Sequence, residues 1–206
     1  MVKFQDLIDF ILGNIEQKNS ENDFFGKLVD EITENMRLKD WERTSSNLIA
    51  NSIEYSVLEG FSDTSMLIST TEFKNTIPSL ERSINYLVEK IDALVSHFRD
   101  SKFTCLADNK IFRRDMSWRS KQVYTKDEYD IIYDKYEEWR KTLFMLHNDL
   151  AYALNLFSDE VRNHINPNYL DRKKFYIYDD LGNYNNLISC IFEPIPPKKN
   201  NKTTKQ

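Results

Sequence analysis

The sequence has few glycines, prolines and cysteines for its length. Four glycines and five prolines in 206 residues leave little material for the tight turns of a β-rich fold, so helices are favoured. The two cysteines, Cys105 and Cys190, are far apart and lack the spacing of metal ligands, which argues against a disulfide framework and against a zinc site. We therefore expect reduced thiols and neither a metal nor another cofactor.

Long apolar runs are also missing. The sequence contains no run of about 18 apolar residues, the length that a membrane helix needs, and its first apolar stretch carries acidic residues, unlike a signal peptide. We expect a cytoplasmic protein that makes no membrane contact. The net charge of -5 argues against a protein that coats nucleic acid with its whole surface, whereas 40% hydrophobic and 13% aromatic residues predict a folded, globular chain.

Apolar residues recur at helical spacing along the first part of the chain. This periodicity predicts helices over residues 3–18, about 24–36 and about 40–59, the last of them ending near Gly60. Residues 61–76 are rich in serine and threonine, and we expect a loop there with room for a short helix.

Two long helices are predicted near residues 78–100 and 126–157. The first begins with a proline, which suits an initial helical turn, and Thr125 and Glu128 form a candidate capping box before the second. The apolar positions of the first are Leu80, Ile84, Leu87, Ile91, Leu94 and Phe98. Those of the second are Tyr129, Ile132, Tyr136, Leu143, Leu150, Leu154 and Phe157. We expect the two helices to pack antiparallel, while the connection over residues 100–124, too long for a hairpin loop, crosses the bundle or forms an excursion of its own.

The chain changes character after Pro167, which ends any helix. Aromatic and β-branched residues around an Asp/Gly/Asn turn predict a β-hairpin over about residues 174–192. Residues 194–206 lack material for a core and are expected to form a disordered tail. The predicted fold is thus mainly α: a single helical bundle domain over residues 1–193, with two long antiparallel helices and a C-terminal β-hairpin.

No hydrolase, metalloenzyme or phosphate-loop motif occurs, but Arg140 and His147 stand two turns apart on one face of the longest predicted helix. An arginine that neutralises a phosphate and a histidine that moves a proton suffice for RNA cleavage without a metal. This spacing resembles the motif of the HEPN family, helical proteins that include ribonucleases of toxin and antiviral defence systems. The resemblance implies a metal-independent ribonuclease or an inactive relative, with Arg140 and His147 as catalytic residues and a homodimer that completes the cleft. The alternative is an ion pair of Arg140 with Glu137 and a locally bonded His147 near the seam.

A second polar cluster lies at the end of the same predicted helix. Arg162 and Asn163 match the arginine and following polar residue of many HEPN proteins, but His164 comes too early and Pro167 interrupts the helix. The alternative is a cluster that satisfies carbonyl groups at the helix end.

The segment 110–121 is the most basic part of the chain, with five positive residues, one negative residue and two aromatic residues. Its candidate binding residues are Lys110, Arg113, Arg114, Trp118, Arg119 and Lys121. Interleaved cations and aromatic rings suit single-stranded nucleic acid or an acidic protein surface, with RNA as one such partner. The alternative is a solvated loop that Trp118 and Phe112 anchor to the bundle. Taken together, these features favour a helical binding or regulatory protein that acts through protein partners, ahead of a HEPN-like ribonuclease and ahead of a nucleic-acid-binding module.

Overall fold

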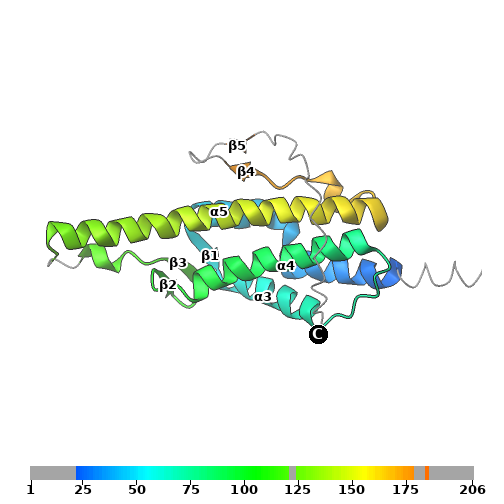
Figure 1. Cartoon of the computed structure of the whole chain (residues 1–206), viewed down its shortest axis with the longest axis horizontal. Coiled ribbons are helices and arrows are strands. Elements are labelled where there is room, and N and C mark those ends of the chain that lie inside the picture. The colour runs from blue at the N-terminus through cyan, green and yellow to red at the C-terminus, as the bar shows by residue number, and fades with distance from the viewer. Residues whose placement is uncertain (1–21, 121–123, 179–183, 186–206) are drawn as a thin grey trace, which may run out of the picture.

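The structure is a computed structural model that describes residues 22–120, 124–178 and 184–185. Several expectations fall outside these residues: the helix over 3–18, Lys121, Cys190 and the tail 194–206. The described chain is mostly helical and carries a small antiparallel sheet, so the expected mainly α class is confirmed (Figure 1).

The helix that includes residues 22–35 comes first in the described chain. The elements after it are η1 (Leu38–Asp40), α2 (Trp41–Ile49), β1 (Ser52–Glu54), α3 (Tyr55–Ser69), α4 (Pro78–Arg99), β2 (Thr104–Ala107), β3 (Ile111–Arg114), η2 (Ser117–Ser120), α5 (Lys126–His164), η3 (Tyr169–Arg172), β4 (Ile177–Tyr178) and β5 (Tyr184–Asn185). Figure 1 shows that α5 spans the length of the molecule and extends past α4 at one end, where the β2–β3 hairpin lies beside it.

The helices α4 and α5 lie side by side (Figure 1). The ring of Tyr86 faces Tyr152 at 6.4 Å, and further along α4 the ring of His97 stacks on Trp139 at 4.7 Å. The apolar stripe of α4 is at most 1% exposed at all six positions: Leu80, Ile84, Leu87, Ile91, Leu94 and Phe98. Because burying one such side chain contributes about 1.5–3 kcal/mol, this seam is a main source of stability.

The predicted helix over residues 40–59 is wrong as a single element. The chain leaves α2 at Ile49, turns through Asn51 with a φ of 62°, forms β1 and becomes helical again at Tyr55. Ile53, which fits the helical apolar spacing, is a buried strand residue. A three-residue strand is too short to show an alternation of its own in the sequence, so the helical period dominated the prediction.

Gly60 does not end a helix, and the loop expected over residues 61–76 is helical as far as Ser69. A Cβ atom on Gly60 would lie 2.1 Å from the backbone oxygen of Asn35. The glycine therefore allows α3 to approach the helix over residues 22–35 closely, which is a packing role that the sequence pattern does not distinguish from a C-cap.

The connection over residues 100–124 forms an excursion of its own, a hairpin that adds to β1. The strand order is β1-β3-β2, with antiparallel pairing of Ile53 with Phe112 and of Phe112 with Leu106. Asp108 and Asn109 both have positive φ, 51° and 54°, and the Lys110 N–H donates to the Ala107 carbonyl at 2.9 Å, as in a type I′ turn. This three-stranded sheet was not predicted, although the Asp-Asn pair is a turn signal.

Residues 174–178 lie along α5 in an extended conformation. Two asparagine side chains of α5 each form two hydrogen bonds with the backbone of one residue, one as acceptor and one as donor. The amide of Asn155 accepts from the N–H of Phe175 at 3.0 Å and donates to its carbonyl at 2.8 Å. Asn148 does the same with Tyr178, at 3.1 Å and 2.9 Å. The strand β4 then pairs antiparallel with β5, while the rest of the hairpin expected over 174–192 lies largely outside the described residues.

Candidate functional site

His147 is a core residue. Its side chain is 1% exposed, its Nε2 lies 2.8 Å from the hydroxyl of Ser45, and its ring stacks on Trp41 at 6.1 Å between centroids. Removal from water lowers the pKa of His147 to about 4, since burial penalises the charged imidazolium; the nearby Asn148 amide opposes this shift. The ring is therefore uncharged near neutral pH and has no open path to a substrate.

Arg140 lies on the exposed side of α5, where its Nε donates to the Glu137 carboxylate at 2.9 Å. The structure thus separates the two residues of the HEPN-like motif, one at the surface and the other inside the bundle. A cleaving pair needs both groups at one accessible phosphate. This geometry does not supply that pair, and the two side chains match the alternative of an ion pair and a locally bonded histidine. The family resemblance itself stays a prediction.

Arg162, Asn163 and His164 do not converge on a site either. The Arg162 guanidinium donates to the carbonyl oxygens of Tyr169 at 3.3 Å and Lys173 at 2.7 Å, so it holds the chain that follows α5 against the helix. Asn163 and His164 are exposed at the end of α5. Arg162 therefore has a structural role, but the carbonyl groups that it satisfies belong to the chain after Pro167 and not to the helix end, where the alternative placed them.

The basic segment divides into two parts in the structure. Lys110 and Arg113 are exposed on the hairpin. Arg114, next along β3, points the other way, and its guanidinium lies 3.7 Å from the ring centre of Tyr136. It also lies 3.9 Å from the Glu137 carboxylate. Only the second part of the segment thus meets the long helix.

The residues brought together at the projecting end of α5 form a surface that we call the aromatic end. It consists of Arg114, Met116, Trp118, Arg119, Tyr129, Tyr133 and Tyr136. The three tyrosines follow one face of α5 at intervals of four and three, with neighbouring ring centres 6.3 Å apart in both pairs. Trp118 lies across them, 5.3 Å from Tyr129 and 5.5 Å from Tyr136.

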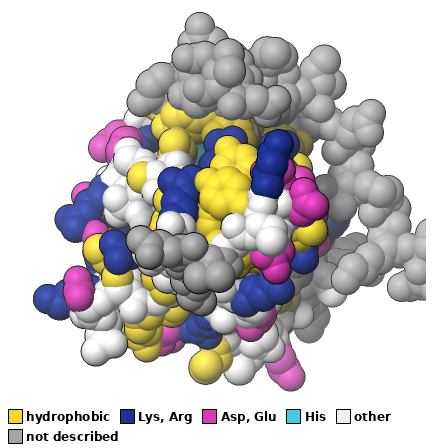
Figure 2. Space-filling view, turned by 90° about the vertical axis from the view of Figure 1, so that its left-hand side faces the viewer, with side chains coloured by type: hydrophobic (Ala, Val, Ile, Leu, Met, Phe, Trp, Pro, Cys, Tyr) yellow, Lys and Arg dark blue, Asp and Glu magenta, His cyan; other side chains and the backbone are white. Residues whose placement is uncertain are grey.

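The outer rings of the aromatic end face solvent. Tyr129 is 42% exposed and Tyr133 is 39% exposed, while Trp118 and Tyr136 are buried beneath. Figure 2 views this end of the molecule and shows hydrophobic side chains at the centre of the face, with Lys and Arg beside them and carboxylates near the rim. The buried rings fix the position of the exposed ones, so the surface is preorganised for contact.

Burial shifts the titration of two groups in this surface. Desolvation raises the pKa of the Tyr136 phenol, although the neighbouring Arg114 acts in the opposite direction. Desolvation also lowers the pKa of Arg114, while Tyr136 and Glu137 favour its charge. The Tyr136 hydroxyl donates to the sulfur of Met116. Near neutral pH the buried phenol is therefore protonated and the guanidinium beside it is charged, so this pair is suited to holding the surface in place rather than to proton transfer.

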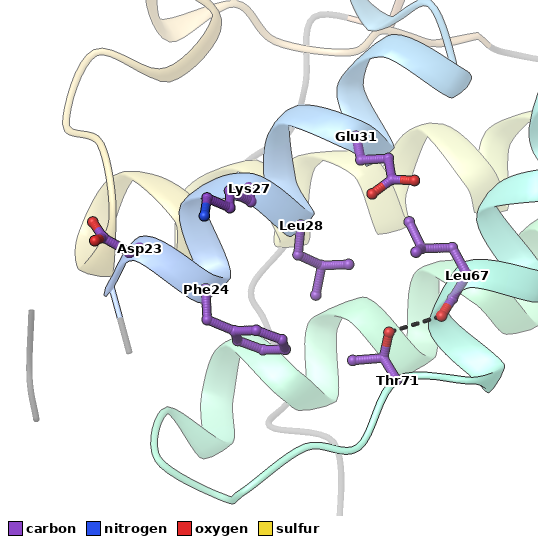
Figure 3. Close-up of a pocket in the computed structure, with 7 residues that line it drawn as sticks. All are labelled: Asp23, Phe24, Lys27, Leu28, Glu31, Leu67 and Thr71. Carbon is purple, nitrogen blue, oxygen red and sulfur yellow. Dashed lines mark hydrogen bonds between the residues drawn. The ribbon is translucent and has the colours of Figure 1, made fainter. Parts of the chain in front are cut away.

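Two cavities lie elsewhere and offer no reacting set of groups. One of about 590 Å³, between the helix over residues 22–35 and α3, is lined by Asp23, Phe24, Lys27, Leu28, Glu31, Leu67 and Thr71. In Figure 3 its apolar side chains point inward, whereas Lys27 and Glu31 stand apart from each other, and the Thr71 hydroxyl donates to the Leu67 carbonyl at 2.7 Å. The other, of about 390 Å³, includes Arg43 and Lys110, but Arg43 is bonded to Glu54.

Metal and membrane sites are not evident in the described part of the chain. Among these residues no three His, Cys, Asp or Glu side chains gather as metal ligands. No described helix combines the length and the apolar character that crossing a bilayer requires.

The sequence pattern indicated the basic part of the aromatic end and placed Tyr136 correctly in the buried stripe, but it did not indicate that Tyr129 and Tyr133 are exposed. Tyr129 and Tyr136 were assigned to the buried stripe of the long helix, and Tyr133 was not singled out. Their spacing along one helical face was a valid signal, but the sequence did not show that α4 stops before reaching them. Comparisons with protein-family models, with curated proteins and with solved structures find no match to this chain.

Proposed function

We propose that the chain is a helical binding or regulatory component that recognises a protein partner through the aromatic end. The observation that carries this proposal is the row of exposed, stacked tyrosines on the part of α5 that extends beyond the bundle. Tyr, Trp, Met and Arg are the residue types enriched at protein interfaces. Rings already held by stacking lose little conformational entropy on binding, which favours affinity.

The charge of the projecting helix favours a protein over a nucleic acid. Residues 126–138 contain six acidic and two basic side chains, a difference of six minus two, or four negative charges. A phosphate backbone would be repelled by these carboxylates, since nucleic-acid affinity rests on neutralised phosphates. A protein partner with apolar and basic groups meets both the rings and the carboxylates.

The test is capture of a partner from the native host by the full chain, followed by measurement of its affinity. Replacing Tyr129 and Tyr133 together with alanine should weaken binding at least about tenfold, as expected for central aromatic anchors. Tyr55→Ala provides a matched control, because Tyr55 is 40% exposed but lies at the start of α3. Equal affinity of the double variant and the Tyr55 variant would contradict the proposal.

Nucleic-acid binding by the hairpin is a second candidate. The exposed side chains of Lys110 and Arg113 support it, together with Arg119, whose guanidinium lies 5.3 Å from the Trp118 ring. It predicts retention of RNA that falls steeply with salt and is abolished by Arg113→Glu. Retention unchanged by that substitution would remove this candidate. The homodimer and the cytoplasmic location stay predictions of the sequence.

A further inference from the structure

The aromatic end has two kinds of neighbouring groups that remain available. The first is the pair of exposed rings of Tyr129 and Tyr133, nearly parallel at 11°. The second is Asp130 and Asp134, each one position further along α5 and thus about 100° around the helix. Both carboxylates are exposed, and neither forms an ion pair with a described residue. The surface therefore presents a row of rings beside a row of uncompensated acids.

One segment of this same chain has the complementary chemistry. Residues 194–199 read Pro-Ile-Pro-Pro-Lys-Lys, with three prolines followed by two lysines. Proline-rich segments favour the polyproline II conformation and bind rows of aromatic side chains, because their rings are apolar and little conformational freedom is lost on binding. The lysines that follow can meet carboxylates beside the rings.

The length of the segment suits the row of rings. Polyproline II has three residues per turn and rises about 3.1 Å per residue, so Pro194 and Pro197 lie on one face about 9 Å apart. The ring centres of Tyr129 and Tyr133 are 6.3 Å apart. This face of the segment is therefore long enough to extend over both rings.

The chain is also long enough to reach. The described structure ends at Asn185, which pairs with Ile177 beside the point where Asn148 holds the C-terminal segment. From Asn148 to Tyr133 is 15 helical positions, or about 22 Å along α5. The nine residues from Asn185 to Pro194 span up to about 30 Å when extended. The distance is thus within the reach of a single copy.

We propose that residues 194–199 dock on the aromatic end of the same chain, with the prolines against Tyr129 and Tyr133 and the lysines beside Asp130 and Asp134. A protein partner that binds the same rings competes with this segment. The inference uses the surface of the proposed function, but it concerns the isolated chain and can be tested with no partner present.

Limited trypsin digestion of the full chain tests the proposal. Trypsin cuts after lysine, and docking protects Lys198 and Lys199, whereas Lys205 lies beyond the docked residues and serves as an internal reference. Cleavage tracks the undocked population. We expect Tyr133→Ala to raise the rate of cleavage after Lys198 and Lys199, relative to Lys205, by about fivefold or more.

Two further variants make the result specific. Joint replacement of Pro194 and Pro197 by alanine leaves every lysine in place and should raise the same rate by a similar factor. Tyr55→Ala, with an almost identical exposed fraction of 40% against 39% for Tyr133, should leave the rate unchanged. Far-ultraviolet circular dichroism checks that each variant keeps its helices.

Equal cleavage ratios in the wild type, the Tyr133 variant and the proline variant would overturn the inference. Protection that disappears on tenfold dilution would also overturn it, because a segment from a second copy would then be the occupant. If the ratios are equal while the tyrosine double variant still loses its partner, the proposed function stands and only the docking fails.

Discussion

The two parts of α5 have similar apolar spacing but opposite surroundings. In the C-terminal part Leu150, Leu154 and Phe157 are fully buried against the bundle, whereas in the N-terminal part Ile131 is 55% exposed and Tyr129 and Tyr133 face solvent. The difference arises because α4 ends at Arg99, close to where its His97 stacks on Trp139. The same amphipathic pattern is therefore core where a neighbouring helix covers it and surface where none does.

The largest expected effect comes from breaking the covered part. Phe157→Ala removes a fully buried ring and should lower the free energy of unfolding by about 3–5 kcal/mol. Ile131→Ala, in the exposed part of the same helix, should change it by less than about 0.5 kcal/mol. Urea denaturation followed by circular dichroism measures both. Similar losses in the two variants would mean that the projecting part is covered in solution.

A second effect concerns the polar interior of the covered part. Burial lowers the pKa of His147 from 6.5 to about 4, so between these pH values the unfolded chain binds a proton that the folded chain does not. The contribution of neutral His147 to the free energy of unfolding is fully present above the pKa that His147 has in the unfolded chain. It is lost as the pH decreases toward the pKa in the folded chain. The shift corresponds to a loss of about 3 kcal/mol between pH 7 and pH 4.

His147→Gln isolates this contribution from that of the carboxyl groups. Glutamine does not titrate, and its amide can still bond the Ser45 hydroxyl that lies 2.8 Å from the histidine. Unfolding free energies measured from pH 7 to pH 4 should fall less steeply in the variant than in the wild type. Parallel curves would show that His147 is protonated equally in both states.

A third pair of variants tests the close helix contact at Gly60. Gly60→Ala places a Cβ atom 2.1 Å from the Asn35 oxygen, and the backbone shift required should destabilise the protein by about 1–3 kcal/mol. Gly26→Ala is the control, because a Cβ there meets nothing within 4 Å and should stabilise the helix by about 0.5–1 kcal/mol. Melting temperatures that move in the same direction would contradict this account.

The smallest expected effect comes from the capping box at the start of α5, in its exposed part. Thr125 accepts from the Glu128 N–H at 3.3 Å, and the Glu128 carboxylate accepts from the Thr125 N–H at 2.9 Å, so the predicted capping box is confirmed. The variant Thr125→Ala should speed amide hydrogen exchange in the first turns of α5 by about two- to fivefold, with no change near Leu154. Uniform acceleration along α5 would indicate a global effect instead.

The sequence was sufficient for elements whose pattern is long and local. The apolar stripe of α4, its initial proline and the capping box of α5 all follow from residues close together in the chain. Short strands were not predictable in the same way, because Ile53 obtains its strand neighbour from Phe112, far along the sequence. Gly60 was misread since the partner that requires a glycine, Asn35, belongs to another helix.

The candidate site shows the same limit. Arg140 and His147 share a helical face by spacing alone, but the neighbours that bury His147, Trp41 and Ser45, come from α2. The cations of the aromatic end could be predicted because they lie close together in the sequence. The exposure of Tyr129 and Tyr133 was not predicted, because it depends on where α4 ends, which no residue within α5 encodes.

The paired amide hydrogen bonds of Asn148 and Asn155 fix the register of the extended chain beside α5. The two asparagines are seven helical positions apart, or about 10.5 Å, and Phe175 and Tyr178 are three extended residues apart, or about 10 Å. The helical distance between the two asparagines matches the extended distance between their backbone partners only in this alignment. Inserting or deleting one residue between Phe175 and Tyr178 would leave one amide without its backbone partner and would turn the side chains of β4 to the opposite side.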